Sequence, residues 1–163
     1  MLALRPMAAA DVAVIKNWPA YPPEFEELDY ALRSHGWMDE YLNNPDAWLY
    51  IAEQAGEIIA FTILAKTSAA EVEFRIALRP DKIGEGLGRA VTTLTLEKVL
   101  EMQLACVHLI VRKSNARAIG LYKSHGFTEC GECVLQVNGK LVNFLNMALT
   151  MRTYAENICD QQI

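Results

Sequence analysis

The stretch Ile83-Gly84-Glu85-Gly86-Leu87-Gly88 decides the fold, because it joins a predicted strand to a predicted helix through three glycines at alternate positions. Apolar residues alternate with more polar ones over residues 72–78, which predicts the strand, and apolar residues recur at helical spacing over residues 86–103. A turn of this kind leaves backbone N–H groups at the positive end of the helix dipole. Its glycines lack the Cβ atoms that would keep a phosphate away. The stretch therefore predicts a phosphate or pyrophosphate site at the start of the helix, with an ordinary strand-to-helix turn as the alternative.

Two common phosphate sites do not fit the surrounding residues. A P-loop needs Gly-Lys-Ser/Thr at the helix start, whereas Gly88 is followed by Arg89-Ala90. A dinucleotide site of the Rossmann type needs an acidic residue near the end of the next strand, which here reads Val111-Arg112-Lys113. A dinucleotide-binding protein stays an alternative, and it predicts stabilisation by NAD.

A second informative stretch, NARAIGLY at residues 115–122, closes with His-Gly-Phe at residues 125–127. Ser114 or Asn115 can cap a helix here, and Gly126 stands where a left-handed helix end belongs. The helix carries Tyr122, whose phenol has an ordinary pKa of about 10 and can protonate a thiolate, whose thiol has a pKa of about 8.5. The alternative is that Tyr122 only packs, because it shares a helix face with apolar residues.

In this order and spacing, the two stretches resemble the GNAT superfamily of acetyl-CoA-dependent N-acetyltransferases. The resemblance implies an α/β fold with a single mixed, largely antiparallel twisted sheet, helices on both faces and splayed central strands. It implies direct transfer of an acetyl group from acetyl-CoA to a primary amine in a ternary complex, without a metal. The amine acceptor would be a small molecule or a protein N-terminus. The residues that the resemblance assigns to acetyl-CoA are Ile76, Ala77, Leu78, Ile83, Gly84, Glu85, Gly86, Leu87, Gly88, Arg89 and Asn115.

The resemblance also implies two catalytic residues. Tyr122 corresponds to the general acid, and Glu73 to a glutamate that acts as a base through water in some members. A backbone N–H near residues 76–78 would hold the oxyanion, and the pantetheine arm would fill the gap between the splayed strands. Glu71 lies on the same strand face as Glu73, so Glu71 or water alone are alternative bases. Both glutamates also fit as solvated carboxylates at a strand end.

Two residues depart from the family pattern. Ile83 stands where the family has arginine or glutamine, and Glu85 stands where many members have lysine or arginine. Positive charge could come instead from Arg79, Lys82 or Arg89. These departures keep open a CoA-binding regulatory module that has lost catalysis.

Composition bounds the other expectations. The chain has 163 residues, enough for one domain over residues 1–152 with a tail at 153–163. A net charge of -5 and a pI of about 5.2 argue against nucleic acid as a partner. We expect a cytoplasmic protein that does not bind a membrane, because neither a spanning segment nor a leader is recognisable. A homodimer is compatible with the sequence.

Acceptor specificity would lie in the acidic and aromatic stretch between Trp18 and Asn44 and in the last hairpin.

Cysteines and histidines do not suggest a metal site. Cys130 and Cys133 form a CxxC, but they lie in a predicted strand, and there is no second pair to complete a zinc tetrahedron. The three histidines have no metal-ligand spacing; they are His35, His108 and His125.

The remaining patterns predict the other elements. Strands are expected over residues 2–4, 48–52, 58–64, 107–111, 128–137 and 141–151, and further helices after Asp11 as a cap and around residues 25–33 and 38–42. Asn138-Gly139 predicts a tight hairpin turn between the last two strands.

Overall fold

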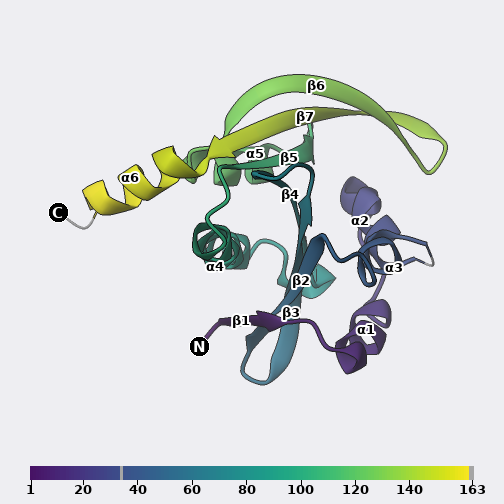
Figure 1. Ribbon diagram of the computed structural model, residues 1–163. Helices are drawn as coiled ribbons and strands as arrows, with labels where there is room; N and C mark the ends of the chain where they lie inside the picture. Colours follow the sequence, from purple (N-terminus) through teal and green to yellow (C-terminus); the bar gives the residue numbers. More distant parts are fainter. Residues whose placement is uncertain (34, 162–163) are drawn as a thin grey trace. The chain divides into compact units, whose positions relative to one another are not determined.

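One sheet of seven strands, in the order β1-β2-β3-β4-β5-β7-β6, organises the fold (Figure 1). The computed structural model describes residues 1–33 and 35–161. β4 and β5 run parallel, whereas the pairs β1–β2, β2–β3, β5–β7 and β6–β7 are antiparallel. The predicted α/β fold with a mixed sheet is therefore confirmed. The strands are β1 (Ala3–Pro6), β2 (Ala47–Gln54), β3 (Glu57–Lys66), β4 (Glu71–Leu78), β5 (Cys106–Arg112), β6 (Thr128–Val137) and β7 (Lys140–Thr150).

The helices lie close to where the sequence predicts them, with one addition at the end of the chain. The residues expected to form a tail belong instead to the last helix, apart from residues 162 and 163, which lie outside the described part. Among the described residues, no helix is both long and apolar enough to cross a membrane. The α-helices are α1 (Ala9–Lys16), α2 (Glu26–Leu32), α3 (Trp37–Tyr41), α4 (Leu87–Glu101), α5 (Ala116–Ser124) and α6 (Met151–Gln161), and the 3-10 helices are η1 (Pro23–Phe25) and η2 (Pro80–Lys82).

The chain divides into two compact units, and the division runs through β4 and α4. The first unit contains Met1–Ala65 and Arg75–Thr95, and the second contains Lys66–Phe74 and the chain from Leu96 onward. Each unit has buried apolar residues of its own.

Two apolar clusters fill the first unit, one on each side of its strands. Adjacent residues of β2, Ile51 and Ala52, belong to different clusters, as strand alternation requires. One cluster holds buried residues of α1, α2 and α3, and the other holds Val91 of α4. Ala77 is 1% exposed in the first of these clusters, while Ile76 packs against the second. Both faces of β4 thus pack against apolar residues, because each cluster includes residues of a helix.

In the second unit, three local signals act as predicted. The side chain of Asn115 caps α5 by accepting a hydrogen bond from the N–H of Ala118 at 3.1 Å. Gly126 follows α5 with φ +102°, a conformation that glycine adopts without strain. Asn138 and Gly139 both have positive φ in the turn between β6 and β7, so the predicted hairpin is confirmed.

Asp11 has another role than the predicted helix cap. The cap position is Ala8, and Asp11 lies in the first turn of α1, where its Oδ2 accepts a hydrogen bond from the N–H of Ala8 at 2.6 Å. Arg5 donates two further hydrogen bonds to this carboxylate at 2.8 and 2.9 Å and one to Glu53 at 2.8 Å. The hydrogen bonds from Arg5 hold the pKa of Asp11 below its usual range, although burial acts in the opposite direction.

We expect Asp11→Asn to lower the free energy of unfolding at pH 7 by about 1–3 kcal/mol, the scale of a hydrogen-bonded charge. Because the folded pKa of Asp11 is depressed, its contribution is present above the unfolded pKa of about 3.9 and is lost as pH falls through the folded pKa. The difference between variant and wild type should therefore shrink below about pH 4. Urea unfolding between pH 3 and pH 7 measures it, with Asp46→Asn, an exposed position, as the control. A difference that is constant with pH would contradict the role of this charge.

Candidate functional site

The glycine turn of the first unit has the backbone that an anion site needs. After η2, Gly84 has φ +90° and Gly86 has φ +80°, and α4 begins at Leu87. Backbones of this kind turn N–H groups toward one concave point at the helix start. A Cβ built on Gly86 meets nothing within 4 Å, so a side chain there would project into open space. The turn leaves room beside its backbone for a ligand.

Most of the charge near this turn is engaged within the protein. Arg79 binds Asp81 through Nε–Oδ1 at 2.6 Å and Nη2–Oδ2 at 3.1 Å, and it also reaches Glu57 at 3.3 Å. Lys82 Nζ lies 4.0 Å from Glu85 Oε2, which partly offsets the unexpected carboxylate in the turn. Arg79 therefore does not supply the free positive charge that the sequence allows for.

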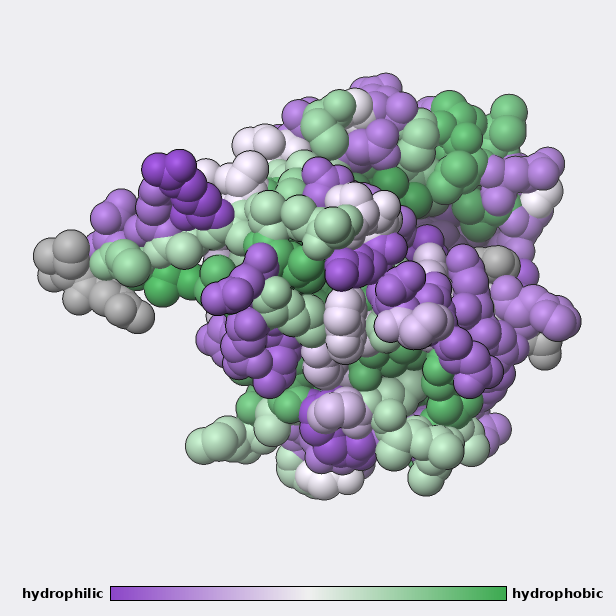
Figure 2. Space-filling view, viewed as in Figure 1, coloured by the Kyte–Doolittle hydropathy of each residue, from purple (hydrophilic) through white to green (hydrophobic). Residues whose placement is uncertain are grey.

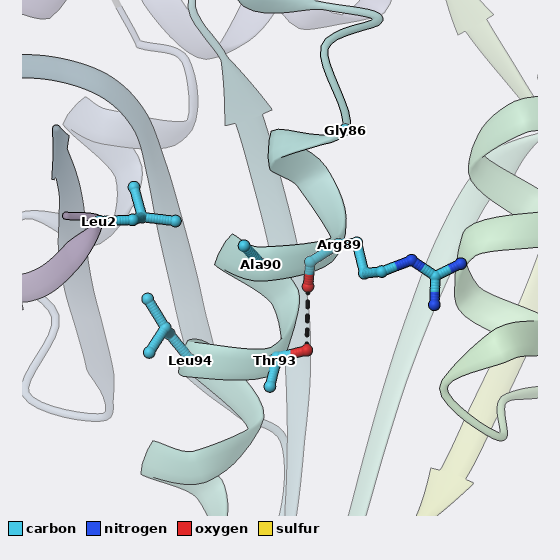
Figure 3. A pocket seen from close by; sticks show the side chains of 6 residues that line it. All are labelled: Leu2, Gly86, Arg89, Ala90, Thr93 and Leu94. Atoms are coloured by element: carbon cyan, nitrogen blue, oxygen red, sulfur yellow. Dashed lines mark hydrogen bonds between the residues drawn. The ribbon is translucent and has the colours of Figure 1, made fainter.

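Arg89 is the better placed cation. It lies in the first turn of α4 and is exposed, and its guanidinium extends away from the apolar residues beside it (Figure 3). A pocket of about 440 Å³ adjoins the same turn of the helix. Its lining residues are Leu2, Gly86, Arg89, Ala90, Thr93 and Leu94, and Thr93 Oγ1 donates to the carbonyl of Arg89 at 3.0 Å.

The end of β4 is fixed by a hydrogen bond that the sequence does not reveal. The buried hydroxyl of Tyr21 donates to the carbonyl oxygen of Leu78, and the N–H of Arg79 donates to the carbonyl of Ile59 at 2.8 Å. Residues 76–78 are the segment that is predicted to bind the co-substrate through its backbone. The carbonyl of Leu78 in this segment already accepts a hydrogen bond within the protein. Burial raises the pKa of Tyr21, so its phenol stays protonated as a donor.

The acidic residues between Trp18 and Asn44 include two that serve the fold. Asp39 pairs with Lys16 and accepts a hydrogen bond from the N–H of His35 at 2.8 Å. Asp29 accepts one from the N–H of Tyr21 at 3.0 Å.

Two aromatic rings that the sequence suggests for binding a cationic acceptor contact a cation of the protein itself. The guanidinium of Arg75 lies 5.0 Å from the ring centroid of Trp37 and 5.3 Å from that of Tyr41. Stacking of this kind is favourable and joins α3 to β4. The alternation of β4 is enough to predict that Arg75 lies on the same face as Glu73. It does not predict the aromatic partners of Arg75, because they lie far away in the sequence.

Tyr122 is enclosed by aromatic rings in the second unit. Its ring lies edge-on to Phe74 at 6.4 Å and to Phe127 at 5.7 Å, measured between centroids, and its side chain is 7% exposed. Burial raises the pKa of its phenol. Tyr122 is thus held in one orientation and keeps its proton at neutral pH.

Glu73 lies on the opposite face of β4 from Phe74, whose ring contacts Tyr122. It is half-buried and directly follows Val72 and precedes Phe74, both buried. Because consecutive strand residues point to opposite faces, Glu73 and Tyr122 flank the strand from two sides.

The pairing between β4 and β5 is short. Its ladder joins Glu71 to Cys106, Val72 to Val107 and Glu73 to His108, whereas β5 pairs with β7 from Cys106 to Arg112. The last four residues of β5 therefore lie beyond the end of this ladder. A backbone edge of this kind can take a ligand by β-type hydrogen bonds.

His108 is a neighbour of Glu73 that the sequence gives no reason to select. The parallel register places the two residues side by side on one face, and His108 Nε2 lies 2.9 Å from Thr67 Oγ1. Only the register of β4 against β5 reveals this proximity.

The CxxC residues occupy a strand, as expected. Cys130 is exposed, and Cys133 is half-buried with its Sγ 3.5 Å from Asn146 Oδ1. In the described part of the chain, no three His, Cys, Asp or Glu side chains gather in a way that could hold a metal ion.

Comparison with known proteins places this geometry among acetyltransferases. The model of the acetyltransferase (GNAT) family matches residues 13–127. The "[Ribosomal protein bS18]-alanine N-acetyltransferase" of Escherichia coli (strain K12) is 40% identical over 76 residues, which cover 47% of this chain and 51% of the relative. The chain thus spans about half the length of this relative.

Two further similarities extend over most of the chain. The spermidine N(1)-acetyltransferase of Escherichia coli (strain K12) is 26% identical over 150 residues, covering 88% of this chain and 77% of the relative. A crystal structure of spermidine N-acetyltransferase from Vibrio cholerae in complex with CoA and spermine has a TM-score of 0.79 at 21% identity, covering 94% of this chain and 98% of the other. The second similarity shows the fold.

Proposed function

Because the chain belongs to the acetyltransferase (GNAT) family, we propose that it transfers an acetyl group from acetyl-CoA to a primary amine. The observation that carries the proposal is the glycine turn at the start of α4, where Gly84 and Gly86 are left-handed and a Cβ on Gly86 would enter open space. A pyrophosphate fits such a turn. The solved structure of similar fold in complex with CoA supports this choice of co-substrate.

In this proposal, backbone N–H groups of residues 83–88 bind the pyrophosphate of acetyl-CoA, and Arg89 adds positive charge. The backbone of residues 76–78 pairs with the pantetheine arm and donates an N–H to the oxyanion. Asn115 contacts the co-substrate through its amide nitrogen, because its oxygen already caps α5. The isoleucine at position 83 adds no charge, so backbone donors do most of the binding.

The proposed reaction needs three proton transfers, two from the acceptor nitrogen and one to the leaving thiolate. Glu73 takes a proton from the ammonium group of the acceptor, directly or through water, and the neutral nitrogen attacks the thioester carbonyl. The C–N bond forms, the C–S bond breaks, and the hydroxyl of Tyr122 gives its proton to the leaving thiolate. The nitrogen loses its second proton as the amide forms, and this proton passes through water to the Tyr122 phenolate, which restores the phenol. A buried site raises the pKa of a thiol as well as that of a phenol, so the ordinary gap of about 1.5 between them need not widen.

The acceptor class follows from shared chemistry. The names of the relatives specify spermidine and the alanine of a ribosomal protein, and both present an amine. We extend to this chain only that common group, a primary amine on a small molecule or a protein N-terminus.

The binding half of the proposal predicts a specific loss in Gly86→Ala. Gly86 and Gly56 form a matched pair, because both have φ near +80° and open space around a built Cβ. Alanine at either position should cost about 1–2 kcal/mol of stability through the left-handed backbone. At about a hundred times Kd, acetyl-CoA should stabilise wild type and Gly56→Ala by about 2.7 kcal/mol, and Gly86→Ala by far less. Thermal unfolding measures this, with NAD as the control ligand. Equal stabilisation of both variants would refute the turn as the binding site.

The general acid is tested by Tyr122→Phe, which keeps the ring against Phe74 and Phe127 and removes the hydroxyl. We expect kcat to fall by about 10²-fold or more, with acetyl-CoA affinity within about twofold of wild type. Tyr154→Phe, another buried tyrosine of the second unit, should leave kcat unchanged. Unchanged turnover in Tyr122→Phe would remove Tyr122 from the mechanism. Acetyl-CoA binding without transfer to any amine would favour the regulatory module.

The base is tested by the pH dependence of Glu73→Gln. Its rate should fall most at low pH, where the acceptor amine is protonated and needs a base, and should approach wild type as pH nears the pKa of the amine, about 10.4 for a lysine-like group. Glu71→Gln is the matched control, since Glu71 shares the strand face but is exposed. A deficit that does not change with pH would shift the role to Glu71 or to water.

A further inference from the structure

His108 is a polar side chain beside the proposed base, and the proposed function gives it no role. It lies opposite Glu73 in the ladder between β4 and β5, on the same face and in the same unit. Neighbouring strands lie about 4.8 Å apart, so the two side chains begin within reach of each other. Both are half-buried, so water can reach the space beside them.

The contact with Thr67 shows in which direction the imidazole extends. Thr67 directly follows β3, and its N–H donates to the carbonyl of Glu71 at 2.9 Å, so Thr67 lies on the β3 side of β4. The sheet order is β3-β4-β5, and His108 Nε2 lies 2.9 Å from Thr67 Oγ1. A ring that starts on β5 and reaches Thr67 must cross over β4. The imidazole therefore passes beside the side chain of Glu73.

The hydrogen bonds of Thr67 assign the hydrogen of the imidazole. Besides its contact with His108 Nε2, Thr67 Oγ1 lies 3.4 Å from the carbonyl oxygen of Glu71. The hydroxyl has a single hydrogen and the carbonyl can only accept, so both hydrogen bonds form together only when Nε2–H donates to Thr67. Among the described residues, no side chain other than Thr67 bonds to the imidazole. Nδ1 is therefore an acceptor that is left for a further donor.

We propose that His108 is a positioning residue, whose Nδ1 holds the water through which Glu73 takes the proton of the acceptor ammonium group. The inference rests on the proposed function, in which Glu73 is the base. The water donates one hydrogen to Nδ1 and the other to the Glu73 carboxylate, which leaves its lone pairs for the ammonium group. It takes a proton from the nitrogen as it passes one of its own to Glu73, so the proton ends on the carboxylate and the imidazole stays neutral.

Three substitutions of His108 separate this role from a structural one. His108→Asn keeps an acceptor oxygen near the position of Nδ1 but is too short to reach Thr67, His108→Gln keeps an N–H near the position of Nε2, and His108→Ala keeps neither. We expect kcat to fall by about tenfold or more in His108→Gln and His108→Ala and by less than about threefold in His108→Asn, because a misplaced water is a poor relay. If the contact with Thr67 were all that mattered, His108→Gln would be the milder change.

The surface control is Arg152→Gln, which should keep the wild-type kcat. Arg152 lies on α6 with its side chain 91% exposed. Figure 2 shows hydrophilic side chains over this helix at the left of the view.

A double-mutant cycle tests whether His108 acts through Glu73. If it does, Glu73→Gln and the double variant Glu73→Gln/His108→Ala should have the same kcat within about twofold, because without the carboxylate the water has nowhere to pass its proton. Full additivity of the two losses would overturn the inference, as would a His108→Gln variant as active as His108→Asn. A failure of the proposed function looks different, because Glu73→Gln would then keep the wild-type rate or wild type itself would transfer no acetyl group.

Heteronuclear NMR of the imidazole gives a readout that needs no acetyl transfer. Neutral His108 of wild type should carry its hydrogen on Nε2, and Thr67→Val should lose this preference while Thr67→Ser keeps it. A hydrogen on Nδ1 in wild type would overturn the inference, because Nδ1 could not then accept from water. Far-UV circular dichroism checks folding. Thr67 is exposed, so Thr67→Val, which should also lower kcat, keeps the inference testable if a His108 variant unfolds.

Discussion

The structure depends on a parallel ladder of only three residue pairs between β4 and β5. Its position fixes which residues of β4 face which side: Val72 and Phe74 toward the aromatic setting of Tyr122, Glu73 toward His108. A longer ladder would use the β5 backbone for protein pairing, and an absent one would free the orientation of Glu73. The proposed chemistry needs both, a fixed strand start and an open strand end.

What the sequence predicts well is local. Gly84 and Gly86 have the positive φ that their spacing in a strand-to-helix turn suggests, Asn115 caps its helix, and Asn138-Gly139 forms the hairpin turn. In each case a residue's own backbone preference or side chain decides the geometry within a few positions. Asp11 shows the limit even there, because Arg5 and the N–H of Ala8 draw it to a position inside the helix.

The contacts that the sequence does not predict join residues that are far apart along the chain. The hydroxyl of Tyr21 binds the carbonyl of Leu78, the guanidinium of Arg75 stacks on Trp37, and Thr67 contacts His108. No periodicity encodes such pairs, since they depend on how elements pack. They matter for the candidate site. The aromatic side chain of Trp37, which the sequence suggests for binding a cation, packs against Arg75 instead. The guanidinium of Arg79 is bound to Asp81 and so is not available to a ligand. The number of charged residues in the sequence therefore overstates how many charges are available to a ligand.

The division into two units has a spectroscopic consequence. The three tryptophans of the chain, Trp18, Trp37 and Trp48, all fall in the first unit, whereas the second holds Tyr122 and Tyr154. Indole fluorescence excited at the red edge of the absorption band thus reports on one half of the polypeptide, while the far-ultraviolet ellipticity of the backbone reports on both. Coincident transitions by the two probes would mean that β4 and α4, which cross the division, transmit unfolding from end to end. Separate transitions would reveal a protein whose halves melt as distinct cooperative blocks.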